Sequence, residues 1–97
     1  MTEASSGLDL ELKRYIRQTV ILDTKSNFIY IGNLQSVTRN TLLLAEVDVH
    51  DCSESRTSRD LYILQSLEHG VRRNRKEVSV FTREVVSISL LADAVVY

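Results

Sequence analysis

A long apolar segment, Val20–Leu44, constrains the fold most, because a glycine lies inside its run of β-branched and aromatic residues. Such residues favour strands. In the expected strand Phe28 and Tyr30 share one face and Ile29 lies on the other, so apolar side chains occupy both faces. This pattern predicts a sheet that is covered on both sides. Gly32 predicts a sharp bend or the close approach of another backbone, since it has no side chain.

Five runs of this kind predict five strands, and polar or turn-forming residues separate them. The expected strands are Thr19–Asp23, Phe28–Val37, Thr41–Asp48, Glu77–Phe81 and Val85–Leu90. A polar stretch from His50 to Ser58 predicts a loop after the third strand. The apolar tail, residues 91–97, is expected to pack on the sheet or on a neighbour.

A short helix is expected before the first strand. Leu8, Leu12, Tyr15 and Ile16 recur at helical spacing, and Ser6 is a good N-cap residue. The helix would have about three turns and would need a docking surface, because helices of this length are marginal alone.

The segment between the third and fourth strands allows two interpretations. Ser58 can cap a helix over Arg59–His69, which Gly70 would end. The residues Asp60–Leu67 are also compatible with a strand, since Tyr62 and the β-branched Ile63 favour one. The complete frame from cap to glycine favours the helix.

The segments Val20–Leu34, Val37–Leu44 and Val80–Ile88 resemble the two halves of the Sm/LSm motif. Within them the matching apolar and glycine positions are Val20, Leu22, Tyr30, Gly32 and Leu34, while Asn27 takes a turn position usually held by glycine. That family forms small bent barrels that assemble into rings, and many of the rings bind single-stranded RNA. The resemblance implies a mainly β (α+β) fold: an N-terminal helix, then a strongly bent five-stranded antiparallel Sm-like barrel with a helical insertion between strands three and four. Residues 1–7 would be a disordered N-terminus and 8–97 a single domain.

The resemblance also implies where RNA would bind. Sm proteins that bind RNA carry Asp and Asn around the turn between strands two and three, and Arg-Gly between strands four and five. Here Thr38 stands at the Asp position, the turn is shorter, and Phe81-Thr82 replaces Arg-Gly. An aromatic ring can stack a base, amides and hydroxyls can read its edge, and arginine can meet phosphate. The candidate RNA-binding residues are therefore Thr38, Arg39, Asn40, Phe81, Thr82 and Arg83.

A short basic run adds Arg72, Arg73 and Arg75 as candidate phosphate contacts. The whole chain has a net charge of −1, which is not typical of a strongly basic nucleic-acid binder. The run is therefore either a binding patch or a solvated loop.

The last two strands would leave open edges in one chain. Open edges are a hazard that pairing between copies removes, and a head-to-tail contact can close into a ring. We therefore predict a cyclic homo-oligomer with an interface at Val78, Val80, Val86 and Ile88.

Enzymatic, metal-binding and membrane roles find little support in the sequence. It holds no glycine-rich phosphate loop, no G-x-S-x-G and no H-E-x-x-H motif, so we predict no enzyme, no catalytic residues and no cofactor. Asp48, His50, Asp51 and Cys52 are ligand types for zinc, but their spacing follows no zinc pattern, which predicts a polar loop and no metal site. No apolar run has the length of a membrane span. The single cysteine suits a reducing compartment, so we predict a cytoplasmic protein.

Two functional hypotheses follow. The first is a ring-forming Sm-like protein that binds single-stranded RNA or supports RNA–protein assembly. The alternative is a structural or scaffold oligomer that recruits protein partners without binding nucleic acid. The basic run favours the first hypothesis, and the missing Arg-Gly favours the second.

Overall fold

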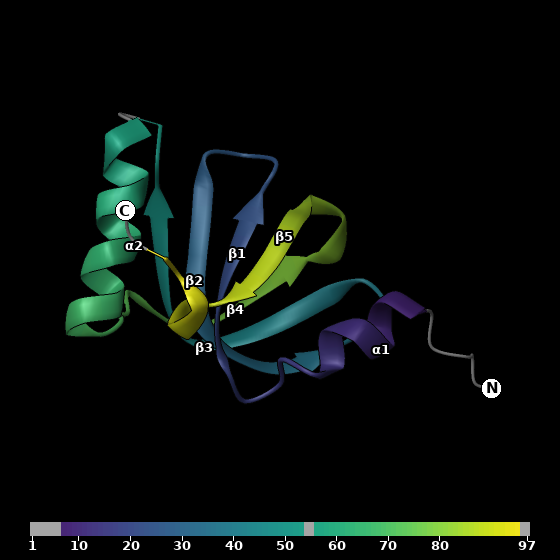
Figure 1. Cartoon of the computed structure of the whole chain (residues 1–97). Helices are drawn as coiled ribbons and strands as arrows, with labels where there is room; N and C mark the ends of the chain where they lie inside the picture. The colour runs from purple at the N-terminus through teal and green to yellow at the C-terminus, as the bar shows by residue number, and fades with distance from the viewer. Residues whose placement is uncertain (1–6, 54–55, 96–97) are drawn as a thin grey trace.

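The computed structural model describes residues 7–53 and 56–95. The frayed N-terminus predicted from the sequence lies, apart from Gly7, outside these ranges. The elements in chain order are α1 (Gly7–Lys13), β1 (Thr19–Thr24), β2 (Phe28–Val37), β3 (Thr41–Asp51), α2 (Arg56–His69), β4 (Arg75–Phe81) and β5 (Val85–Leu90) (Figure 1). Short 3₁₀ turns follow the last two strands, at Thr82–Glu84 and Leu91–Asp93.

The five strands form one antiparallel sheet in the order β4-β3-β2-β1-β5, so β4 and β5 are its edges. The sheet bends strongly where β2 faces β3. There the pairing passes from Ile31 opposite Asp48 to Asn33 opposite Ala45, so two residues of β3, Glu46 and Val47, stand opposite Gly32 alone. Among these, Glu46 adopts a φ of 53°, in the left-handed region that side chains other than glycine seldom occupy. The predicted bent five-stranded antiparallel sheet is confirmed.

Gly32 lies at this bend because a side chain would not fit. A Cβ atom there would lie 3.1 Å from the Ala45 carbonyl oxygen and 3.1 Å from a methyl carbon of Val47. The predicted close approach of a second backbone is therefore present, and β3 supplies it.

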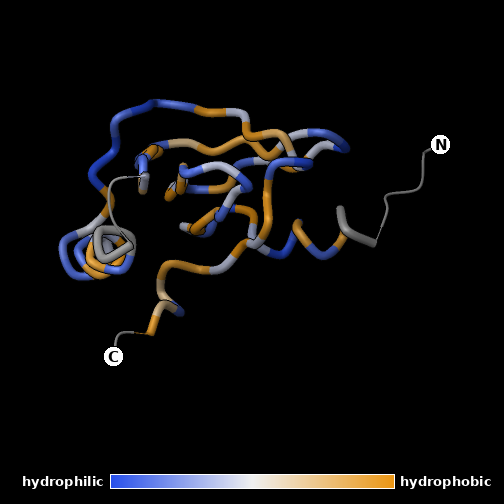
Figure 2. The backbone as a smooth tube through the Cα atoms, turned by 90° about the horizontal axis from the view of Figure 1, so that it is seen from above, coloured by the Kyte–Doolittle hydropathy of each residue, from blue (hydrophilic) through white to orange (hydrophobic). Residues whose placement is uncertain are grey.

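Both faces of the sheet are covered, as the apolar pattern predicted. The inner face holds the main core, which includes Leu12 of α1 together with the fully buried Leu22, Leu34 and Leu44. On the outer face, Ile21, Ile29, Ile31, Tyr62 and Leu91 form a second cluster beneath α2 and the C-terminal turn. Figures 1 and 2 place α1 and α2 on opposite sides of the sheet.

The inserted segment is a helix, which decides between the two interpretations of the sequence. It begins at Arg56, three residues before the expected start, and ends at His69 as predicted. Gly70 follows with a φ of 87°, and its amide donates to the Ser66 carbonyl over 3.0 Å. This left-handed glycine is a common way to end a helix.

Besides the start of α2 and the end of β1 at Thr24, three further boundaries differ from the sequence prediction. The first helix ends at Lys13, before Tyr15 and Ile16 of the expected helical pattern, because Arg17 adopts a φ of 70° and its amide donates to the Leu34 carbonyl. Pairing with β2 extends β3 to Asp51, so the expected loop begins later. Pairing of Val47 with Arg75 likewise starts β4 before Glu77. In each case main-chain pairing in the folded chain outweighs local sequence preference.

None of the helices in the described ranges is both long and apolar enough to cross a membrane.

Candidate functional site

Two surfaces of the molecule carry clustered polar and aromatic side chains. The first is the loop site, which consists of Thr38, Arg39, Asn40, Phe81, Thr82 and Arg83. The second is the helix pocket between α2, the end of β3 and the segment of residues 70–74.

The loop site brings together two loops that are distant in sequence. Thr41 pairs with Phe81 across the β3–β4 ladder, so the turns beside these residues meet. The Thr82 amide donates to the Asn40 carbonyl over 2.8 Å, and the Thr82 hydroxyl donates to the Arg39 carbonyl over 3.4 Å. The structure thus places all six predicted loop residues at one end of the β3–β4 pair.

The chemistry of the loop site centres on Phe81. Its side chain is 52% exposed, and the Arg83 guanidinium carbon lies 5.2 Å from the ring centroid. Thr38 is engaged within its own turn, since its hydroxyl bonds with the Thr41 hydroxyl over 2.7 Å and accepts the Thr41 amide over 3.0 Å. The site therefore offers an exposed aromatic ring and arginine side chains to a ligand. The hydroxyl of Thr38, which was predicted to bind a base edge, instead stabilises its own turn.

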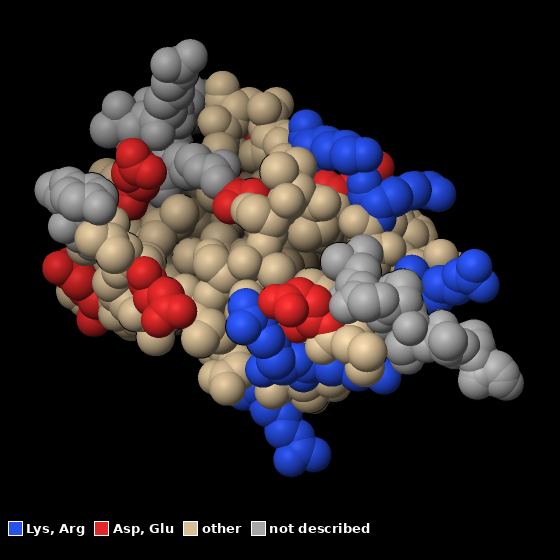
Figure 3. Space-filling model, turned by 45° about the vertical axis from the view of Figure 1, so that its right-hand side comes forward, with Lys and Arg blue, Asp and Glu red and all other residues tan. Residues whose placement is uncertain are grey.

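The basic run lies away from the loop site. Arg73 forms an ion pair with Glu46, and Arg75 donates to the Asn74 carbonyl over 2.9 Å. Because Arg75 and Phe81 stand at opposite ends of β4, about 20 Å of strand separates them. Figure 3, which draws one face of the molecule, shows the Lys and Arg side chains of the face in view in separate groups.

The four residues predicted for an oligomer interface occupy different environments. Val80 is 4% exposed and belongs to the main core, and Val78 and Ile88 pack against that core. Only Val86, 66% exposed on β5, presents its side chain to the surface. The side chains of the other three therefore stabilise the chain itself, and the outer main-chain groups of the edge strands β4 and β5 stay available for pairing.

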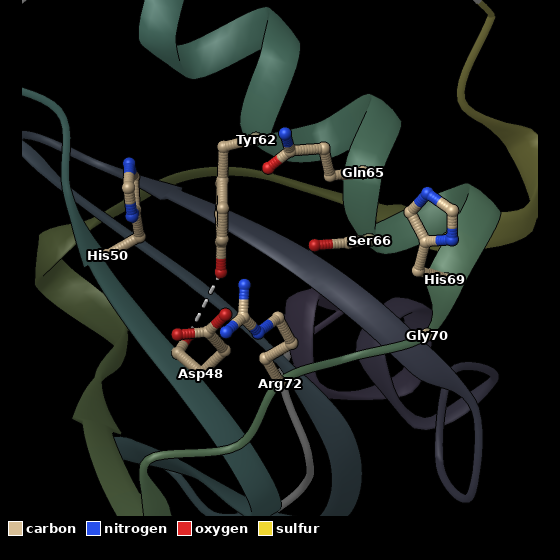
Figure 4. A pocket seen from close by; sticks show the side chains of 8 residues that line it. All are labelled: Asp48, His50, Tyr62, Gln65, Ser66, His69, Gly70 and Arg72. Atoms are coloured by element: carbon tan, nitrogen blue, oxygen red, sulfur yellow. Dashed lines mark hydrogen bonds between the residues drawn. The ribbon is translucent and has the colours of Figure 1, made fainter.

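The helix pocket has a volume of about 690 Å³ and is lined by α2, β3 and Arg72 (Figure 4). The rings of Tyr62 and His50 stack with centroids 3.9 Å apart and planes 9° from parallel. Figure 4 shows Tyr62 between His50 on one side and Ser66 on the other, with its hydroxyl directed at Asp48. That hydroxyl donates to the Asp48 carbonyl oxygen over 3.5 Å.

Burial governs the electrostatics of the pocket. Removal from water raises the pKa of the Tyr62 hydroxyl far above its ordinary value, and the charge of Asp48 raises it further. Tyr62 therefore stays a neutral donor at physiological pH. Asp48 is only 7% exposed, and its carboxylate accepts a hydrogen bond from the Asn74 amide nitrogen over 3.0 Å.

Asn74 fixes the segment after α2 against β3. Its side-chain oxygen accepts the Val49 amide over 3.0 Å, and its side-chain nitrogen donates to the Val49 carbonyl over 3.1 Å. The Asn74 side chain thus pairs with the main chain of β3 just before β4 begins at Arg75, and it continues the β3–β4 hydrogen-bond ladder by one step.

Sequence reasoning did not find the helix pocket. From the sequence, Asp48 and His50 are candidates only as metal-ligand types, and Tyr62 is considered only for the secondary structure of the inserted segment. The available signal was a carboxylate inside an apolar strand, because such groups are seldom buried without a partner.

No protein-family model matches the chain, and no curated protein matches it. Among solved structures, it is similar to the Sm protein of Pyrococcus abyssii in complex with a uridine heptamer, with a TM-score of 0.57, 18% identity, and coverage of 89% of this chain and 99% of that one.

The chain is also similar to chains in two crystal structures of the NatC complex. For the complex bound to Gag peptide and CoA, the TM-score is 0.54 and the identity 26%, over 81% of this chain and 89% of that one. For the complex bound to CoA, the TM-score is 0.54 and the identity 24%, over 93% of this chain and 88% of that one.

Proposed function

Because the chain has the Sm-like fold, we propose that it is a non-catalytic subunit of a protein complex of the NatC kind. The observation that carries this proposal is the 26% identity to a chain of the NatC complex bound to Gag peptide and CoA, against 18% to the Sm protein solved with a uridine heptamer. In this role the chain contributes binding surfaces, and other subunits carry the chemistry.

The loop site supports a protein-binding role. Thr38 replaces the Asp that RNA-binding Sm proteins carry, and its hydroxyl is engaged with Thr41. An exposed phenylalanine beside an arginine also suits a protein interface, because aromatic and arginine side chains are enriched in such interfaces. The basic run adds no continuous phosphate track, since Arg73 is paired with Glu46.

The sheet edges provide the second support. Both β4 and β5 have an unpaired side in a single chain, and an extended segment of a partner can add to such an edge. Val86 presents an exposed aliphatic side chain on β5, where a partner could bury it. We propose that a different protein of the complex pairs with these edges.

The test is co-purification of the tagged chain from its own cells. We expect other polypeptides in stoichiometric amounts, and we expect Val86→Asp to lower their yield at least about tenfold, because a partner would then have to bury a charge. Leu10→Asp is the matched control. It places the same charge at a leucine that is 63% exposed on α1, and it should leave the yield unchanged. Recovery of the chain with copies of itself alone would contradict the proposal.

A second candidate is a homo-oligomeric ring that binds single-stranded RNA through the loop site. The exposed Phe81 ring beside Arg39 and Arg83 favours it, together with the similarity to a protein solved with a uridine heptamer. Under this candidate a uridine heptamer binds the purified chain, and Phe81→Ala weakens binding about 5- to 150-fold through lost stacking. A fluorescence anisotropy titration checks this, and equal affinity of Phe81→Ala and the unaltered chain would remove the loop site from the candidate.

A further inference from the structure

The helix pocket contains a buried carboxylate, Asp48, that makes no direct ion pair with the described side chains, although Arg72 also lines the pocket. Asp48 is 7% exposed, and no Lys or Arg among residues 10–53 and 60–95, whose side chains the structure describes, forms an ion pair with it. Its carboxylate has the Asn74 amide as a hydrogen-bond donor. Burying an ionised carboxylate is costly unless a cation compensates it. The pocket of about 690 Å³ beside it leaves room for such a cation to enter.

In the part of the chain that the structure describes, one other polar atom of the pocket lining lacks a hydrogen-bond partner, and two more side chains can accept hydrogen bonds. The Nε2 atom of His50 is buried and has no hydrogen-bond partner among the described residues. Gln65 and Ser66 of α2 add an amide and a hydroxyl oxygen to the lining (Figure 4). A ligand that binds several of these hydrogen-bond acceptors at once needs several N–H or O–H donors held in one rigid group.

The Tyr62 ring adds a preference for a flat cation. The two stacked rings of Tyr62 and His50 form one wall of the pocket. Guanidinium is planar, carries five N–H donors, stacks on aromatic rings and loses its water more readily than ammonium. Arginine therefore fits the carboxylate, the acceptors and the aromatic wall better than lysine does.

We propose that the helix pocket receives an arginine side chain of a partner protein, with the Asp48 carboxylate as its counter-ion. The inference rests on the proposed function, since the arginine belongs to a subunit of the same complex. Arg72 lines the pocket beside Asp48 (Figure 4) and repels the incoming guanidinium. It therefore limits the affinity for single arginine residues and favours a partner that is held elsewhere as well.

The test uses the full chain and small probes, so it does not depend on the identity of the partner. N-acetyl-arginine methylamide is titrated into ¹⁵N-labelled protein, with N-acetyl-citrulline methylamide as the uncharged probe of similar shape. We expect saturable shifts of the amide signals of Tyr62, Gln65 and Gly70 with the arginine probe, and affinity at least about tenfold lower for citrulline. Equal binding of the two probes, or no saturable shift with either, would overturn the proposal.

Three variants sharpen the result. Asp48→Asn keeps the size of the side chain and should weaken arginine binding at least about tenfold, whereas Asp93→Asn, which removes a charge outside the pocket, should leave it unchanged. Arg72→Gln should strengthen binding severalfold, because it removes the repelling charge. Inorganic phosphate is the opposite probe: if phosphate binds and Arg72→Gln abolishes its binding, the pocket is an anion site and the proposal fails. Because co-purification is measured separately, loss of the arginine site leaves the proposed function standing.

Discussion

Replacing Tyr62 with alanine will detach α2 from the sheet while the strands stay paired. Among residues 60–69 of α2, only Tyr62 and Ser66 are buried, and Tyr62 is the large buried side chain that α2 contributes to the outer cluster, with the half-buried Ile63 packed against it. Removing a buried aromatic side chain typically costs about 3–5 kcal/mol. A helix of 14 residues depends on its packing, so losing this anchor removes most of its stability.

Hydrogen exchange read by mass spectrometry checks this result. We expect the amides of α2 to lose their protection in Tyr62→Ala, while those of β1, β2 and β3 keep most of theirs. Tyr62→Phe is the matched control. It retains the ring and its stacking with His50 and removes only the hydroxyl bond to Asp48, which is worth about 1 kcal/mol. Equal loss of protection in α2 and in the strands would show that α2 is part of the cooperative core.

Replacing Gly32 with valine will destabilise the whole sheet. Its Cβ atom would lie 3.1 Å from both the Ala45 carbonyl oxygen and a methyl carbon of Val47, and two further methyl groups need additional room. Overpacking of a well-packed core costs about 1–3 kcal/mol. Denaturant unfolding measures the change, and Gly32→Ala should lie between valine and the unaltered chain.

A double-variant cycle separates this clash from a general effect of the substitution. Val47→Ala removes the methyl carbon from the three atoms that the new Cβ would meet, although it also costs stability as a buried residue. We expect the pair Gly32→Ala and Val47→Ala to cost less than the sum of the single changes, because the two sites share one contact. Strictly additive costs would mean that the Val47 side chain contributes nothing to the clash at position 32.

The sequence predicted the fold well where the pattern of apolar residues was regular. The bounds of β2 and β5 agree with the prediction, and Gly32 marks the bend because only an absent side chain admits β3. The left-handed Arg17 was not predictable, since it depends on the Leu34 carbonyl that its amide reaches across the fold.

The two candidate sites differ in how far the sequence could reveal them. The resemblance to Sm proteins predicted that the two loops of the loop site lie together, and the hydrogen bond between Thr82 and Asn40 agrees with that expectation. The helix pocket depends on where α2 docks and on the irregular pairing that turns Asp48 toward it. Apart from the carboxylate inside an apolar strand, local patterns do not indicate the docking of α2 or the irregular pairing, because both follow from packing between distant segments.

The most direct test of the central proposal is the mass of the intact assembly that the chain forms in its own cells, measured by native mass spectrometry without nuclease treatment. The proposal predicts a complex that contains this chain together with different, larger polypeptides and no mass from nucleic acid. A ring made only of copies of this chain and carrying RNA would contradict it and would support the second candidate function.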